Sequence, residues 1–174
     1  MKPPTVSLRP LHPDGFDAFV ERAAEAYAAS RAVAVSATFD DAVVDARAQT
    51  ASLVPQGFAT PGHEVMERDV VVGQLWIATT EVDGFRSAVV YDVSIRERLR
   101  GRGRQAMKLA EDVARRLGAR DVELHVFAHN AAAVRVYERL GYRTASLGMR
   151  KTLGVGSGDE ESVSFGPGVP SPPR

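Results

Sequence analysis

The segment between residues 86 and 127 constrains the fold more than any other part of the chain. Apolar residues alternate over 86–95, as in a half-buried strand, and alternate again at Val122, Leu124 and Val126. Between them, an apolar stripe has the spacing of an amphipathic helix, at Met107, Ala110, Ala114 and Leu117. Gly118 is the expected C-terminal cap of that helix. A strand, a crossover helix and a strand predict a parallel pair with a right-handed connection, and hence the α/β class with a mixed sheet.

The rest of the chain adds strands and helices around this unit. Further strands are expected at 6–11, 63–69 and 70–81. Turns between the strands are indicated at Arg68-Asp69 and Asp83-Gly84. Further helices are expected at 16–27, 39–53 and 133–140. Thr38 or Ser36 can cap the helix at 39–53, Gly141 closes the last helix, and residues 142–153 are expected to form a final strand or pair of strands.

The chain is 174 residues long, which favours a single domain, placed here at residues 1–153. Residues 154–174 are rich in Gly, Ser and Pro and nearly free of large apolar side chains, so they are predicted to form a flexible tail. The longest apolar runs are about five residues, far short of the roughly 20 that span a bilayer. Because the N-terminus also lacks a signal-peptide pattern, a cytoplasmic protein without a membrane partner is expected.

Thiol and metal chemistry are disfavoured by the composition. The chain has no Cys, which excludes a disulfide, a thiolate nucleophile and a Cys-based zinc site. No pair among the four His residues has the spacing of a helical metal motif. We therefore expect no metal.

The net charge is zero, but the charges are unevenly distributed. Residues 1–95 carry 7 basic and 13 acidic side chains, whereas residues 96–120 carry 9 basic and 3 acidic ones. The zero total argues against an overall basic nucleic-acid binder. The acidic first half suits the binding of a cationic amine. This inference rests on charge alone.

The basic excess is concentrated where a strand ends and a helix begins. Residues 96–105 read RERLRGRGRQ, with five Arg and two Gly. A helix start leaves backbone N–H groups without intrahelical partners, and glycines let an anion approach them closely. A solvated basic turn and a nonspecific nucleic-acid patch are the alternatives, but the Gly pair at this junction favours a diphosphate site. Neither a P-loop nor a dinucleotide-binding fingerprint is present.

Two blocks resemble the GNAT N-acetyltransferase superfamily. The run from Arg98 to Gly103, RLRGRG, resembles its Q/R-x-x-G-x-G/A acetyl-CoA signature. Residues 130–142, NAAAVRVYERLGY, look like its N-x-x-A-x-x-x-Y-x-x-x-G-[FY] helix. The strand ELHVFAH lies between them, where the family has its fifth strand, and SLGMRKTL resembles a closing strand. The resemblance covers about residues 70–153 well, and the part before them only in element order.

The resemblance implies a GNAT-like mixed sheet of six or seven strands flanked by about four helices. Its fourth and fifth strands, here 86–95 and 121–127, would be parallel and splayed, with acetyl-CoA in the gap. The acetyl group would pass directly to a primary amine of a small molecule or peptide. The residues implied to contact the cosubstrate are Val93, Ser94, Ile95, Arg98, Arg100, Gly101, Arg102, Gly103, Arg104, Gln105, Asn130 and Tyr137. Gln105 departs from the small residue that many members have at that place, whereas Asn130 can also cap the following helix.

Such a transfer needs help with two proton movements. An alkyl ammonium, with a pKa of about 10.4, must lose a proton before it attacks, and the departing thiolate must gain one. The resemblance makes Tyr137 the general acid, although its place on the apolar helix face also fits a core aromatic residue.

The general base is less constrained by the sequence. Strand alternation puts Val89, Tyr91 and Val93 on one face and Val90, Asp92 and Ser94 on the other. Asp92 is then a charge in a strand that should be interior, where it is costly unless it faces a cleft, pairs with Arg or binds the amine. His125, Glu64, Glu67 and a water-mediated base are the alternatives.

Two other function classes compete with an acetyltransferase. The same fold could serve as a noncatalytic acyl-CoA sensor or interaction domain, because a fold does not determine a function. A basic nucleic-acid module is the other, and it would bind with steep salt dependence. We expect the enzyme, without a nucleic-acid partner, and a homodimer is a candidate assembly.

Overall fold

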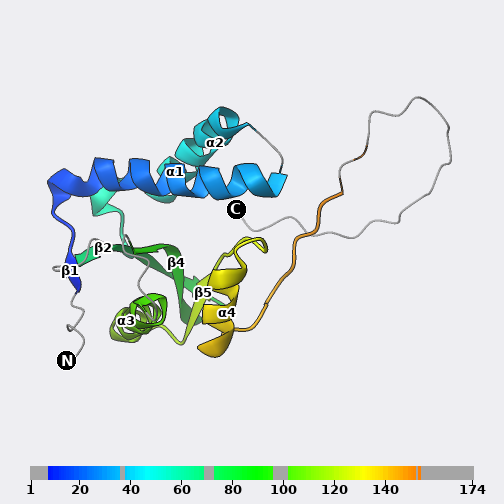
Figure 1. The fold of residues 1–174 in the computed structure, drawn as a ribbon. Helices are drawn as coiled ribbons and strands as arrows, with labels where there is room; N and C mark the ends of the chain where they lie inside the picture. The colour runs from blue at the N-terminus through cyan, green and yellow to red at the C-terminus, as the bar shows by residue number, and fades with distance from the viewer. Residues whose placement is uncertain (1–7, 36–37, 69–72, 96–101, 152, 154–174) are drawn as a thin grey trace, which may run out of the picture.

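The computed structural model describes residues 8–35, 38–68, 73–95, 102–151 and 153 (Figure 1). Five strands form one mixed sheet in the order β1-β2-β3-β4-β5. They are β1 (Leu8–Pro10), β2 (His63–Arg68), β3 (Gly73–Val82), β4 (Phe85–Ile95) and β5 (Asp121–Leu124). The first four are antiparallel to their neighbours, and β5 is parallel to β4. The predicted α/β class and the parallel strand pair are thus confirmed.

Four helices cover the two faces of the sheet, as Figure 1 shows. They are α1 (Phe16–Val35), α2 (Phe39–Leu53), α3 (Arg102–Arg116) and α4 (Ala131–Arg139), with 3-10 turns η1 (Pro13–Gly15) and η2 (Gly57–Ala59). On one face α3 buries its apolar stripe against the sheet, with Met107 and Val113 each 1% exposed. On the other face α1 packs Phe19 against Trp76 of β3, with ring centroids 5.7 Å apart. The expectation of about four helices is confirmed.

Short-range signals in the sequence act as predicted. Thr38 caps α2, since its Oγ1 accepts a hydrogen bond from the backbone N–H of Asp41 at 3.3 Å. Gly118 has φ +77° just after α3, and Ala119 N donates to Ala114 O at 3.0 Å. That pattern is the Schellman motif, in which a left-handed residue ends the helix. The turn at Asp83-Gly84 has positive φ at both residues, as a tight hairpin requires.

Two expected strands differ in the structure. The first is limited to β1, of which only three residues pair, while residues 6 and 7 lie outside the described part of the chain. The described residues between 142 and 153 form no strand, which corrects the prediction of a closing strand or pair of strands. Figure 1 shows this segment leaving the body of the molecule after α4, so no sheet edge satisfies its backbone. Leu147 and Met149 accordingly remain 73% and 90% exposed.

The described sheet therefore has five strands rather than six or seven. The last parallel pair between β4 and β5 joins Val90 to Leu124, although β4 continues to Ile95. The splaying of these strands stays a prediction. The predicted tail at 154–174 and the turn residue Asp69 lie outside the described residues. Within the ranges that the structure describes, no helix is long and apolar enough to cross a membrane.

A bulge in β4 corrects the predicted alternation of that strand. Pairing with β3 passes from Ile77–Val90 to Trp76–Asp92, so Tyr91 is one extra residue. Directly opposed residues share a face, and Asp92 therefore lies on the Trp76 face, toward α1. Val90 and Val93 both pack with the cluster under α3. Val90 and Asp92 are thus on opposite faces, contrary to the expectation that they share one.

Candidate active site

Asp92 is a half-buried residue whose carboxylate has an incomplete set of hydrogen bonds. Its Oδ2 atom is inaccessible to solvent and has no hydrogen-bond partner among the described residues. Burial raises the pKa of Asp92 to about 6, and a hydrogen bond from Gln74 and the positive charge of Arg22 oppose that rise. A carboxyl with such a pKa is ionised at neutral pH and can also accept a proton there. Perturbed groups of this kind cluster at functional sites.

Tyr137 of α4 lies close enough to Asp92 for the two to interact electrostatically. The side chain is half-buried and packs against the cluster under α3. Burial raises the pKa of Tyr137, and the negative charge of Asp92 raises it further. The phenol therefore stays protonated through the neutral range and remains a proton donor. The start of α4 is held by Asn130, whose Oδ1 accepts from Ala133 N at 3.2 Å, which confirms the predicted cap.

Three aromatic rings lie on the Asp92 face of the sheet. Trp76 Nε1 donates to His63 Nδ1 at 3.0 Å, and the Tyr91 ring stacks on His63 with an interplanar angle of 3°. Because Nδ1 of His63 accepts this bond, the neutral ring carries its proton on Nε2. Burial lowers the pKa of His63, which favours that neutral form. Sequence reasoning did not single out His63, Trp76 or Tyr91 as a group, and the bulge puts Asp92 on the same face as Tyr91.

The other base candidates lie elsewhere. His125 is exposed just beyond β5, with its ring 4.9 Å from that of Phe127. Glu64 is opposite Ile77, which faces α3, so Glu64 is on the face away from Asp92. Glu67 is opposite Gln74 on the Asp92 face, and it forms an ion pair with Arg9 at 2.8 Å. Of the candidate bases, Asp92 acts electrostatically on Tyr137, whereas His125 is exposed and Glu64 is on the face away from Asp92.

The residues predicted to hold a cosubstrate are only partly described. Arg98, Arg100 and Gly101 lie outside the described residues, whereas Arg102, Gly103, Arg104 and Gln105 form the first turn of α3. N–H groups in a first turn lack intrahelical partners and carry the positive end of the helix dipole. Arg104 and Gln105 are exposed, and a Cβ built on Gly103 would meet no atom within 4 Å.

The second predicted contact is the end of β4. Val93 and Ser94 are half-buried there, and Ile95 is the last residue of the strand. From Tyr91 onward, β4 has no ladder partner in β5 among the residues described. An open helix start fits the diphosphate of a coenzyme A ester, and an unpaired strand edge fits its amide-bearing arm.

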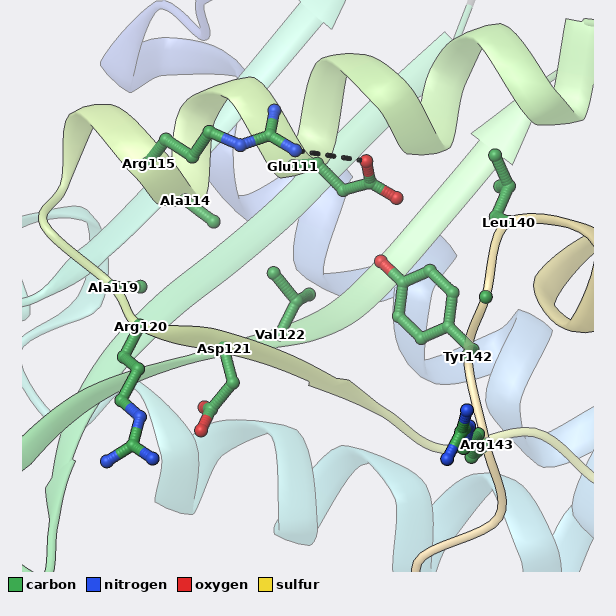
Figure 2. Close-up of a pocket in the computed structure, with 11 residues that line it drawn as sticks. Glu111, Ala114, Arg115, Ala119, Arg120, Asp121, Val122, Leu140, Tyr142 and Arg143 are labelled. Carbon is green, nitrogen blue, oxygen red and sulfur yellow. Dashed lines mark ion pairs between the residues drawn. The ribbon is translucent and has the colours of Figure 1, made fainter.

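A separate hollow lies at the other end of the β4–β5 pair. It has a volume of about 460 Å³, and α3, the start of β5 and residues 140–143 enclose it (Figure 2). Figure 2 shows the Tyr142 hydroxyl directed toward Glu111, which pairs with Arg115 at 3.5 Å. Burial and the charge of Glu111 raise the pKa of Tyr142. Neither Asp92 nor Tyr137 lines this hollow, so it is distinct from the candidate site. Among the described residues, no group of three or more His, Asp or Glu could hold a metal ion.

Comparison with known proteins identifies the family. The chain is 31% identical to the uncharacterized N-acetyltransferase YycN of Bacillus subtilis over 156 residues, which cover 86% of this chain and 99% of YycN. It is 27% identical to the uncharacterized N-acetyltransferase YdgE of the same organism, over 84% of this chain and 98% of YdgE. The crystal structure of YycN superposes with a TM-score of 0.77 at 29% identity, covering 86% of this chain and 99% of that one. An acetyltransferase structure from Pyrococcus furiosus, at 23% identity and a TM-score of 0.62, shares the fold over 86% of this chain and all of its own.

The family profile agrees with these relatives. Residues 35–142 match the Acetyltransferase (GNAT) family, and this range includes the first turn of α3, Asp92 and Tyr137. The resemblance inferred from the two sequence blocks is therefore confirmed. The chain belongs to the GNAT family of acetyltransferases.

Proposed function

We propose that this protein transfers an acetyl group from acetyl-CoA directly to a primary amine of a small molecule or peptide. The observation that carries the proposal is the buried, unpartnered Oδ2 of Asp92, whose charge acts on a protonated Tyr137. A buried carboxylate oxygen without a donor is costly, and an ammonium group would supply the missing donor. Membership of the GNAT family, which normally uses acetyl-CoA, supports the choice of acetyl donor.

The two groups divide the proton transfers between them. Asp92, ionised at neutral pH, takes a proton from the acceptor ammonium and leaves a neutral amine. The amine attacks the thioester carbonyl carbon, a C–N bond forms and the C–S bond breaks. Tyr137 gives its proton to the departing sulfur and regains one from the nitrogen, and Asp92 releases its proton to water. Holding both substrates in one site removes much of the entropic barrier to the encounter.

A panel of primary amines, scored by CoA release and by mass spectrometry of the products, tests the proposal. The wild-type chain should acetylate at least one amine, and Tyr137→Phe should lower kcat by about 10²- to 10⁴-fold, because the phenol donates the leaving-group proton. Tyr142→Phe is the matched control, since its ring lies 5.8 Å from that of Tyr137 but its hydroxyl faces the separate hollow.

Two outcomes would contradict the proposal. If acetyl-CoA raises the Tm but no amine on the panel stimulates CoA release, the chain is a noncatalytic acyl-CoA binder. If Tyr137→Phe and Tyr142→Phe lower kcat equally, the role given to Tyr137 is wrong.

A further inference from the structure

Gln74 and Asp92 are neighbours on the α1 face of the sheet. Trp76 is directly opposite Asp92, and Gln74 is opposite Ser94, so Gln74 and Asp92 are diagonal partners across β3 and β4. Diagonal positions on one face are within reach of long side chains. Gln74 acts on the Asp92 carboxyl as a hydrogen-bond donor that lowers its pKa, which fits this diagonal placement.

Arg22 of α1 contacts Gln74. Phe19 and Arg22 lie three positions apart on α1, so they share one face of the helix. Phe19 contacts Trp76, and Arg22 reaches the next residue on the same face of β3, Gln74. Arg22 donates to Gln74 Oε1 from Nη2 at 2.8 Å and from Nε at 3.3 Å.

This contact decides which way the Gln74 amide is turned. A guanidinium has only donors, so it must face the amide oxygen and not the NH₂ group. The NH₂ group is then turned away from Arg22 and can donate to the carboxyl of Asp92. Oδ2 of that carboxyl is left without a hydrogen-bond partner among the described residues.

We propose that Gln74, oriented by Arg22, is a positioning residue that fixes the Asp92 carboxyl with its Oδ2 free to receive the acceptor amine. The inference rests on the function proposed above and names the two residues that prepare its base. No ion pair joins Arg22 directly to Asp92 among the described residues. A direct pair in the fork geometry would have occupied both carboxylate oxygens. An intervening NH₂ group can donate to one carboxyl oxygen while Oδ2 stays open.

The test is the titration of Asp92 in variants of the two positioning residues. The charged and titratable groups that act on Asp92 are Arg22 from α1 and Tyr137 from α4, with the neutral Gln74 from β3. The Gln74 hydrogen bond and the Arg22 charge both lower the pKa of Asp92, so removing either should raise it. We expect Gln74→Met and Arg22→Met each to raise it by about one unit. Carbon-13 NMR of the carboxyl carbons in Asp-labelled protein measures this without any substrate.

The effects of the Gln74 and Arg22 substitutions on the pKa of Asp92 should also be coupled. Because Arg22 acts partly through Gln74, the double variant should shift the pKa of Asp92 by less than the sum of the two single shifts. Arg22→Lys, which keeps the charge and can still donate to Oε1, should restore part of the wild-type value. Arg22 is exposed, so this pair of variants keeps the test available if Gln74→Met is unstable. Arg31→Met is the matched control, since Arg31 lies on the same helix but pairs with Asp45 at 3.1 Å.

With an amine that the enzyme acetylates, the acidic limb of the pH–rate profile should move to higher pH by the same amount in both single variants. An Asp92 titration that is unchanged in Gln74→Met and Arg22→Met overturns the inference. If NMR shows a shifted Asp92 pKa but the acidic limb of the pH–rate profile does not move, Asp92 is not the general base, and that part of the proposed function is wrong. The remaining outcome is an Asp92 pKa that is unchanged in Gln74→Met and Arg22→Met, while Asp92→Asn abolishes the acidic limb of the pH–rate profile. That outcome supports the proposed function and refutes only the positioning role of Gln74 and Arg22.

Discussion

Replacing Asp92 by Asn should stabilise the protein at neutral pH while it impairs acetyl transfer. The pKa of Asp92 is about 6 in the fold, against 3.8 for an exposed Asp, with burial as the main cause. Between about pH 4 and 6 the folded chain therefore binds this proton more tightly than the unfolded chain does. Stability falls as the pH rises through that window and stays reduced above it.

The expected size of this effect follows from the same two values. Each pKa unit corresponds to about 1.4 kcal/mol, so the ionised Asp92 costs about 3 kcal/mol of unfolding free energy above pH 6. Asn has nearly the same shape as Asp and no charge, so Asp92→Asn should recover up to that amount at pH 7.5 and almost none at pH 4. For a chain of this length, the gain would raise the Tm by about 6 to 12 °C.

Urea unfolding of both proteins from pH 4 to 7.5 measures the effect, with the fluorescence of Trp76 as the probe. Trp76 is the single Trp of the chain, is 3% exposed and lies directly opposite Asp92. Asp45→Asn is the control, because its side chain is 60% exposed and its ion pair with Arg31 should contribute less than about 1 kcal/mol. The reasoning is refuted if the stability difference between wild type and Asp92→Asn stays constant over this pH range.

Three further substitutions test local features of the structure. Gly118→Ala should cost about 1 to 2 kcal/mol of unfolding free energy, measured in urea, because φ at this position is +77°. A Cβ there would meet only Arg86 Nη1, at 3.8 Å, so the loss would come from the backbone conformation and not from a steric clash. Gly103→Ala, in a helix turn with open space around it, should instead be neutral or stabilising by up to about 1 kcal/mol, and equal losses in the two variants would contradict this account. Trp76→Phe removes the donor to His63 Nδ1, so the pKa of His63 should rise in proton NMR of its imidazole. An unchanged His63 titration would mean that the hydrogen bond does not set its protonation.

The sequence predicted those features that depend on neighbouring residues. Thr38 and Asn130 each cap a helix by accepting a hydrogen bond from the backbone N–H three residues later. Gly118 ends α3 through hydrogen bonds to the preceding turn. The two motif blocks indicated the family correctly, because each is a contiguous run of residues. The α3 stripe also reported correctly which face of that helix is buried.

The features that sequence missed depend on distant partners. Arg22 and Gln74 are 52 positions apart, and no local pattern links them. Alternation was wrong around Asp92, because a bulge depends on how two strands pair and not on the residues of one. The closing strand expected within 142–153 is absent from the described residues, because a segment suited to a strand still needs a sheet edge to pair with.

The bulge adds one residue to β4 that the regular alternation of the strand does not need. β3 has 10 residues and β4 has 11, and the surplus residue is Tyr91. A β4 without Tyr91 would alternate regularly, with Val90 and Val93 still under α3 and Asp92 still opposite Trp76. Tyr91 is thus an insertion that the hydrophobic core tolerates without rearrangement. Evolution can alter the residue at that place, and with it the aromatic surface shared with His63 and Trp76, while the pattern that specifies the fold is left intact.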